Sequence, residues 1–286
     1  MHHIPFRLAN EEHPLIIVSA AINDNGPYDF LFDTGNGSPV AILLSPSFIE
    51  KSKMVIEDDK HAAKTEYQQL RIQRFQIGDL LYKNLTASIV DSLDAFGKQI
   101  GVALAGNVGF HFLKKWCVKI DYQKNMLTLS ESKVSLSNSQ PFENGANGAF
   151  ILLQTEVNGA GPFRFLLDTG ASSSVISPAL AAKLDLQGTA IDALSVLGSQ
   201  GAQMVTLDTL KAAGEIQHGI EAAVIDIFEY TSEAAGIQID GIVGYSFLRN
   251  YSIVIDYPQQ RLALTKQDND KSLVSDNSAN QELTAQ

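Results

Sequence analysis

The chain has 286 residues, of which 45% are hydrophobic and 19% are charged, and its formal net charge is −11. This length and composition are those of a globular protein with enough apolar residues for two ordinary domains or one large one. The acidic balance argues against nucleic acid or an anionic membrane surface as a partner, because like charges repel.

The single cysteine, Cys117, excludes an internal disulfide and gives no support for an oxidising compartment. It lies in an apolar run, so we predict a small core residue rather than a nucleophile. No apolar stretch approaches the ~18 residues of a membrane span, and the first residues lack the layout of a signal peptide. The sequence as given therefore favours a cytoplasmic location, or a periplasmic or secreted one if an export signal has been removed.

In chain order, the first half predicts short strands separated by turns. Residues 15–22 and Tyr28–Phe32 form an expected hairpin around a turn at 23–27, and the return strand ends at Asp33. A buried strand over Val40–Leu44 and a short helix beginning at Pro46 follow. Further strands are expected within 67–77, 85–90, 116–121 and 126–129.

The second half repeats this pattern. Residues 150–157 and 163–167 form an expected hairpin that ends at Asp168, and a helix is expected from Pro178. Residues 131–148 are rich in Ser, Asn, Gly and Glu, which is typical of a linker. The residues after Lys266 are polar and unpatterned, as in a disordered tail. We therefore divide the chain into a first lobe over 1–132, a linker over 133–147, a second lobe over 148–266 and a tail over 267–286.

Two pairs of segments show that the halves are copies. Residues 26–35 (GPYDFLFDTG) and 161–170 (GPFRFLLDTG) are identical at seven of ten positions and are 135 residues apart. Residues 106–122 and 241–257 are identical at eight of seventeen positions at the same spacing of 135. An equal spacing at both ends of the unit indicates a duplicated domain, the single-chain counterpart of a two-fold dimer.

Each copy ends an apolar strand with Asp-Thr-Gly, so Asp33 and Asp168 are candidates for a paired-carboxylate site. Two carboxylates within hydrogen-bonding distance share one proton, because both cannot ionise cheaply. The ionised member can then take a proton from a bound water while the protonated member donates to a substrate carbonyl oxygen. The hydroxyls of Thr34 and Thr169 could link the two loops by hydrogen bonds. Gly35 and Gly170 have no side chain, so they allow the backbone to approach the carboxylates closely.

On these motifs, the chain resembles the pepsin/retropepsin superfamily of aspartic proteases. The resemblance also rests on the turns Gly106-Asn107-Val108-Gly109 and Gly241-Ile242-Val243-Gly244, each followed by a short helix and two strands. The resemblance implies an all-β protein of two pseudo-symmetric retropepsin-like β-barrel lobes, each with a short helix. It also implies an aspartic endopeptidase in which Asp33 and Asp168 activate a water in a cleft between the lobes. Thr34, Gly35, Thr169 and Gly170 correspond to the loop scaffold of the family. The implied substrate is a peptide or protein, and the fused lobes imply a monomer.

The flaps and the residues after each Asp-Thr-Gly depart from the pattern of the family. Gly198, Ser199, Gln200 and Gly201 fall where one flap hairpin should cover an extended peptide. The corresponding first-half segment, 58–66, has no glycine and is heavily charged, so we expect unequal flaps. Pepsin-like enzymes place a hydroxyl directly after Asp-Thr-Gly that bonds the carboxylate. This chain has Asn36 and Ala171 there, without the hydroxyl. We therefore expect the lower of the two pKa values of the carboxyl pair to be raised, and activity at weakly acidic pH.

Other functions leave weaker signals in the sequence. The six histidines show no metal-ligand spacing, and the Gly-x-Val-Gly turns lack the frame of a nucleotide-binding loop, so we expect no metal and no cofactor. Two alternatives to the enzyme stay open. One is a catalytically silent peptide-binding module that keeps the fold, and the other is a fused dimer that serves only as an assembly scaffold.

Overall fold

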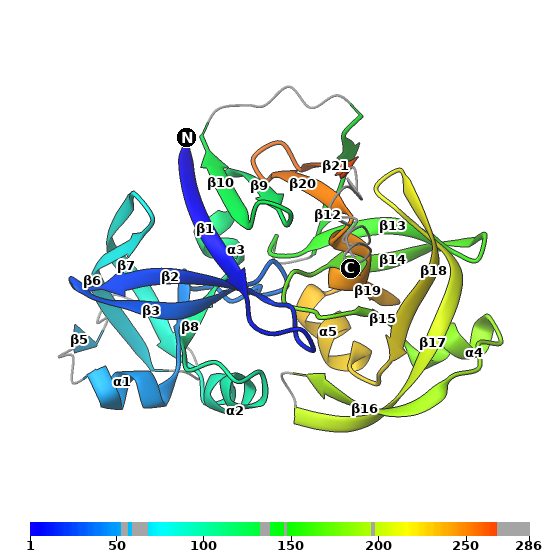
Figure 1. The fold of residues 1–286 in the computed structure, drawn as a ribbon, viewed down its shortest axis with the longest axis horizontal. Coiled ribbons are helices and arrows are strands. Elements are labelled where there is room, and N and C mark those ends of the chain that lie inside the picture. The colour runs from blue at the N-terminus through cyan, green and yellow to red at the C-terminus, as the bar shows by residue number, and fades with distance from the viewer. Residues whose placement is uncertain (53–56, 59–67, 132–137, 146–147, 196–197, 268–286) are drawn as a thin grey trace, which may run out of the picture.

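The protein consists of two β-barrel lobes joined by a shared sheet (Figure 1). The computed structural model describes residues 1–52, 57–58, 68–131, 138–145, 148–195 and 198–267. The first lobe runs from blue to green in the figure and the second from green to orange. The expected all-β class with two barrel lobes and a few short helices is confirmed.

Each lobe contains a closed barrel of six strands, because the first and last strand of the series also pair with each other. In the first lobe the order is β2 (Ile16–Ile22), β3 (Asn25–Phe32), β8 (Leu104–Val108), β4 (Ile42–Leu44), β7 (Leu80–Ile89) and β6 (Gln69–Ile77), and β2 pairs with β6. In the second lobe it is β13 (Ile151–Val157), β14 (Ala160–Leu167), β19 (Gly241–Val243), β15 (Ser174–Ile176), β18 (Glu215–Val224) and β17 (Gly198–Ala212), and β13 pairs with β17. The duplication read from two short segments therefore extends through both barrels.

A third group of six strands joins the lobes at the top of Figure 1. Its order is β11 (Gln140–Pro141), β21 (Arg261–Lys266), β20 (Tyr251–Asp256), β9 (Cys117–Asp121), β10 (Met126–Ser130) and β1 (His2–Leu8). The central pair consists of β9 from the first copy and β20 from the second, with Ile120 opposite Ile253. Cys117 is buried in this sheet as a free thiol, which confirms its prediction as a core residue.

The strands that lead to the two aspartates are buried on both faces. Phe30, Leu31 and Phe32 at the end of β3 are each at most 2% exposed, and the same holds, within 3%, for residues 165–167 at the end of β14. Each strand lies between an antiparallel neighbour from its own hairpin and a parallel neighbour, β8 or β19. Central strands of this kind read as continuous apolar runs, which explains the sequence pattern.

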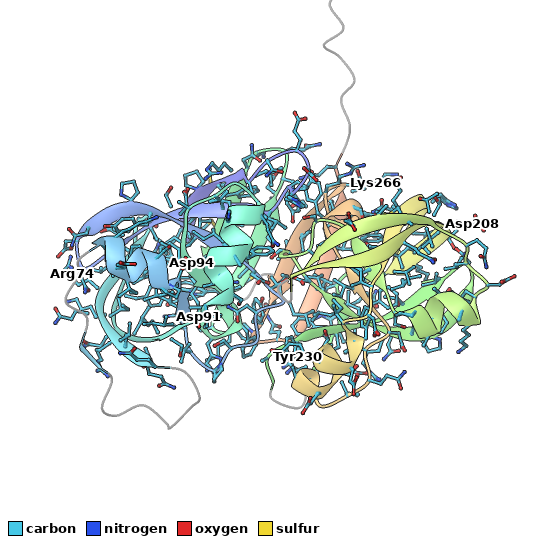
Figure 2. All side chains as sticks on the ribbon, turned by 90° about the horizontal axis from the view of Figure 1, so that it is seen from below. Arg74, Asp91, Asp94, Asp208, Tyr230 and Lys266 are labelled. Atoms are coloured by element: carbon cyan, nitrogen blue, oxygen red, sulfur yellow. The ribbon has the colours of Figure 1, made fainter. Side chains whose placement is uncertain are left out.

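Six short helices complete the described residues, and two of them were missed from the sequence. They are α1 (Pro46–Ser52), α2 (Ser92–Gln99), α3 (Phe110–Leu113), α4 (Pro178–Lys183), α5 (Phe228–Ala235) and α6 (Tyr245–Leu248). The missed helices α2 and α5 lie on the underside of the molecule in Figure 2, where Asp94 marks α2 and Tyr230 marks α5. Asp94 accepts hydrogen bonds from the backbone N–H and the hydroxyl of Ser47, and so fixes α2 against α1.

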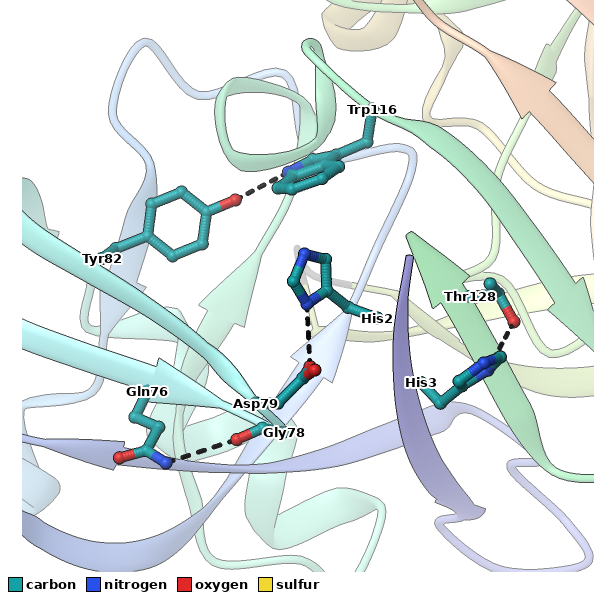
Figure 3. A network of polar contacts seen from close by, with 8 residues as sticks. All are labelled: His2, His3, Gln76, Gly78, Asp79, Tyr82, Trp116 and Thr128. Carbon is teal, nitrogen blue, oxygen red and sulfur yellow. Dashed lines mark hydrogen bonds and ion pairs between the residues drawn. The ribbon is translucent and has the colours of Figure 1, made fainter. Parts of the chain in front are cut away.

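The N-terminal strand β1 is fastened to the first barrel by a polar network (Figure 3). His2 lies 3.0 Å from Asp79 and packs edge-on against Trp116, whose indole N–H donates to the hydroxyl of Tyr82. The second half of β1 crosses to pair with β2, so this strand joins the shared sheet to the first barrel.

The expected linker, first-lobe flap and C-terminal tail are described only in part by the structure. Part of the expected linker is ordered, as β11 and β12 (Glu143–Asn144), which pair with β21 and β13. The expected first-lobe flap over 58–66 starts at the end of strand β5 (Glu57–Asp58), and its residues 59–66 lie outside the described residues. The expected tail lies outside them too, except for Gln267, which donates to Asp121. Among the helices that the structure describes, each is too short or too polar to cross a membrane.

Replacing Gly106 with alanine is expected to destabilise the first barrel. A Cβ atom at this position would overlap the carbonyl oxygen of Leu43 and lie 2.8 Å from the Phe30 ring, both in the barrel wall. Overpacking of this kind costs about 1–3 kcal/mol. The matched control is Gly201→Ala, because nothing lies within 4 Å of a Cβ there. Chemical denaturation should show a lower free energy of unfolding for Gly106→Ala and a change within about 0.5 kcal/mol for Gly201→Ala. Equal stabilities would contradict this close packing.

Candidate active site

Asp33 and Asp168 begin the loops that follow the two buried central strands. The backbone N–H of Asp33 donates to the Val108 carbonyl of β8 (3.0 Å), and that of Asp168 donates to the Val243 carbonyl of β19 (3.1 Å). Each Gly-x-Val-Gly segment therefore lies beside the corresponding Asp-Thr-Gly loop and fixes its start. Because the barrels supply these contacts in the same register, the two loops have matching backbone geometry.

The two loops are joined by four hydrogen bonds that cross between the lobes. The backbone N–H of Thr34 donates to the hydroxyl of Thr169 (3.1 Å), and that of Thr169 donates to the hydroxyl of Thr34 (3.0 Å). Each hydroxyl also donates to the opposite strand, Thr34 to the carbonyl of Leu167 (3.0 Å) and Thr169 to that of Phe32 (3.1 Å). Both threonines are 1% exposed, so these bonds lie away from competing water. We call this set of bonds the threonine interlock.

The interlock brings each carboxylate against the glycine of the opposite loop. A Cβ atom at Gly35 would lie 2.5 Å from Cγ of Asp168, and one at Gly170 would lie 2.7 Å from Cγ of Asp33. Each glycine also donates its backbone N–H to the aspartate of its own loop, at 2.8 Å in the first lobe and 2.7 Å in the second. Only glycine permits this approach, and it leaves the two carboxyl groups within hydrogen-bonding contact of each other.

The two carboxyl groups hold their protons unequally. Burial raises the pKa of Asp33, although hydrogen bonds from Asn107 and from the carboxyl of Asp168 act in the opposite direction. The pKa of Asp168 lies well above its usual range, first because of burial and then because of the charge of Asp33. A carboxyl pair of this kind shares one proton over the intervening pH range, and Asp168 has the higher affinity for it.

Two asparagines that were not predicted as site residues contact this pair. Asn107 on β8 is 5% exposed and donates its side-chain N–H to Oδ2 of Asp33 (2.8 Å). Its own side-chain oxygen accepts from the amide of Asn36 (3.0 Å). A signal for both was present in the sequence, because the second copy has Ala171 and Ile242 at these positions. From the sequence we expect Asn36 only to lack the hydroxyl of the family, and we assign no role to Asn107.

The predicted flap residues lie in a long hairpin of the second lobe. Strand β16 (Thr189–Ser195) pairs with the start of β17, and its Asp192 to Ser195 stand opposite Gly201 to Gly198. The side chains of Ser199 and Gln200 lie outside the described residues, as do residues 196–197 at the turn. The expected hairpin is present, but Gly198 to Gly201, which the sequence predicts as its turn, lie on its second strand.

No group of three or more potential metal-ligating side chains occurs in the part of the chain that the structure describes. The polar neighbours of Asp33 and Asp168 are backbone N–H groups, asparagine amides and threonine hydroxyls. The N–H groups orient the carboxylates by hydrogen bonds, and the threonine hydroxyls bond the backbone of the opposite loop.

Removing one hydroxyl of the threonine interlock is expected to destabilise the protein. Thr34→Val keeps the shape of the side chain but leaves the Leu167 carbonyl and the Thr169 N–H without their partner. Each buried group left unpaired costs about 1–3 kcal/mol. The control is Thr155→Val, because Thr155 is equally buried but donates only to Phe163 within its own lobe. Denaturant unfolding should show the larger loss for Thr34→Val, and a smaller loss than for Thr155→Val would refute the importance of the interlock.

The raised pKa of Asp168 predicts a pH-dependent cost to stability. The folded protein binds this proton more tightly than the unfolded chain, so stability falls as the pH rises above about 4, the ordinary pKa of aspartate, towards the folded-state pKa. Asp168→Asn removes the buried charge, so we expect it to melt at a higher temperature than the wild type at pH 7. The difference should shrink as the pH falls below about 4. The exposed Asp208 on the same lobe (Figure 2) provides the control, since Asp208→Asn should change the melting temperature little at either pH.

Comparisons with known proteins agree with this architecture. The Aspartyl protease family model matches residues 153–247, which lie in the second lobe. No curated protein sequence matches the chain significantly. The crystal structure of the aspartic proteinase from Irpex lacteus is similar over 94% of this chain and 98% of its own, with a TM-score of 0.54 and 12% sequence identity. The second lobe thus matches the Aspartyl protease family model, and the fold of both lobes is the one seen in an aspartic proteinase.

Proposed function

We propose that this protein is an aspartic endopeptidase that hydrolyses peptide bonds with the Asp33/Asp168 pair. The observation that carries the proposal is the paired carboxylates themselves, held in contact across the lobes by the threonine interlock and unequal in proton affinity. The match of the second lobe to the Aspartyl protease family model and the fold of both lobes support the reaction class.

The reaction uses one ionised and one protonated carboxyl group. A water bound between them loses a proton to the ionised aspartate as it attacks the carbonyl carbon of the scissile bond. The protonated aspartate donates its proton to the carbonyl oxygen, and a neutral tetrahedral intermediate forms. Return of a proton to the departing amine then breaks the C–N bond. Thr34, Gly35, Thr169 and Gly170 keep the two carboxyl groups in the geometry that these transfers need.

The substrate is an extended peptide or an unfolded segment of a protein, bound in a cleft between the lobes. The β16–β17 hairpin supplies the covering flap, with Gly198, Ser199, Gln200 and Gly201 on its second strand. An extended peptide forms backbone hydrogen bonds with such a hairpin, and pockets for alternate side chains set the preference. The formal net charge of −11 argues against nucleic acid as the substrate.

The proposal is tested by incubating the protein with a mixed peptide library between pH 3 and pH 8 and identifying the products by mass spectrometry. We expect cleavage by the wild type and a loss of about 10²–10⁴-fold in rate for Asp33→Asn and for Asp168→Asn, the range of general acid–base contributions. Asp208→Asn, an exposed carboxylate of the second lobe, serves as the matched control and should cleave like the wild type.

The outcomes separate the proposed function from its two alternatives. Binding of a statine-type inhibitor or of peptides without cleavage at any pH would identify a silent peptide-binding module. Absence of both binding and cleavage would identify a scaffold. Cleavage that survives both Asp→Asn substitutions would show that the activity belongs to another site or to a contaminant.

A further inference from the structure

We propose that Asn107, held in place by Asn36, is a positioning residue that keeps the negative charge of the pair on Asp33 and so makes Asp33 the base and Asp168 the acid. The inference rests on the proposed function for its chemical meaning. Its physical basis is a one-sided chain of hydrogen bonds that reaches one carboxylate and not the other.

The chain of bonds begins at a backbone group and ends at Asp33. The backbone N–H of Ser38 donates to the side-chain oxygen of Asn36 (3.0 Å), and the Asn36 amide donates to the side-chain oxygen of Asn107 (3.0 Å). The Asn107 amide then donates to Oδ2 of Asp33 (2.8 Å). Since the backbone N–H of Gly35 already donates to Oδ1, both oxygens of Asp33 receive a hydrogen bond from an uncharged donor.

The direction of this chain is fixed by its first member. A backbone N–H can only donate, so the atom of Asn36 that faces Ser38 is the oxygen, and its NH₂ group faces Asn107. Asn107 must then accept from Asn36 with its oxygen and turn its own NH₂ group to Asp33. A side chain held in this way always offers Asp33 a donor. A donor stabilises the ionised carboxylate and disfavours the protonated one.

The second lobe has the same backbone but lacks the amides. The carbonyl of Asn36 accepts from Phe110 N–H at 2.9 Å, and the carbonyl of Ala171 accepts from Tyr245 N–H at the same distance. The side chains at the second-lobe positions are aliphatic, and both Ala171 and Ile242 pack with the apolar cluster of that lobe. Asp168 receives hydrogen bonds from the backbone N–H groups of Gly170 and Gly35, but Ile242, the counterpart of Asn107, offers no side-chain donor. The two lobes therefore differ in donors while they agree in backbone geometry.

The other titratable groups around the pair do not explain the asymmetry. Asp33 faces Asp168 across the interlock. It also faces the buried phenol of Tyr257, whose pKa is raised by burial and by the charge of Asp33. Asp168 faces the phenol of Tyr122, whose pKa is likewise raised, first by burial. Both phenols are uncharged at the pH of the reaction. The two lobes thus provide the same pair of neighbours.

His111 on α3 is the remaining titratable group near this loop. Its pKa is lowered by burial and by the charge of Lys114, against a hydrogen bond with the backbone of Ser38. It has no direct contact with Asp33 among the described hydrogen bonds, and it stays unchanged in all the variants below. Any contribution of His111 to a pH profile is therefore common to the wild type and the variants.

The test compares pH profiles of kcat/KM for three single variants. Asn107→Leu removes the amide donor to Asp33 at nearly constant side-chain volume. A hydrogen bond to a charged carboxylate lowers its pKa by about one unit or more. We expect the acid limb of the kcat/KM profile to move to higher pH by about one pH unit. The alkaline limb should stay at the same pH, so the profile becomes narrower. Asn36→Ala, which copies the second lobe, should give a smaller shift in the same direction. Ile242→Val, at the matching buried position of the second lobe, should leave the profile where it was.

A titration of the carboxyl carbons by NMR on the folded protein gives the same answer without turnover. Asp33→Asn and Asp168→Asn assign the two signals. We expect the lower of the two macroscopic pKa values of the pair to rise in Asn107→Leu. Thermal unfolding checks that each variant is folded at the pH of measurement.

The two readouts distinguish the inference from the function on which it rests. A shift of the carboxyl titration in a protein that cleaves no peptide would refute the endopeptidase and support the placement of charge. Normal cleavage with the same acid limb in Asn107→Leu and the wild type would overturn the role of Asn107 and leave the endopeptidase intact. Equal shifts in Asn107→Leu and Ile242→Val would also overturn it, because a general loosening of the barrels would then be the cause.

Discussion

The threonine interlock is the constraint on which the candidate site depends. Two barrels that each end a strand in a carboxylate would keep those charges apart in water, because bringing them together is costly. Four buried hydrogen bonds between Thr34, Thr169 and the opposite strands oppose that repulsion. The shared sheet, with β9 against β20, joins the lobes a second time. The carboxyl groups are therefore held in contact by parts of the fold that carry no charge.

Sharing one proton is the consequence of this enforced contact. The proton reduces the repulsion, and it also gives the pair an acid and a base at the same pH. The same burial that raises the pKa of Asp168 makes the site a source of instability at neutral pH. Strain of this kind is common where a fold holds reactive groups ready, and rigid surroundings have to support it. The central strands β3 and β14, buried on both faces, provide that support.

Much of the fold and of the candidate site could be predicted from the sequence. The repeat with a spacing of 135 residues predicted two similar lobes, and the apolar runs before Asp33 and Asp168 predicted the buried strands that end there. The helices α2 and α5 were missed because neither begins with a proline, the signal that predicted α1 and α4. The family model matches residues 153–247, which include the Asp-Thr-Gly motif of the second copy.

The sequence by itself determined the duplication, the fold class and the two candidate carboxyl groups, because apolar periodicity and repeated motifs are local properties of a chain. Only the tertiary structure decided that the pair is asymmetric. Asn36 and Asn107 are 71 residues apart, and nothing in their spacing indicates that one orients the other. Parallel pairing of β3 with β8 places Asn107 beside Asp33, and the turn of the loop brings Asn36 to Asn107. Hydrogen bonds between distant residues depend on strand register, and register is fixed only when the barrel closes.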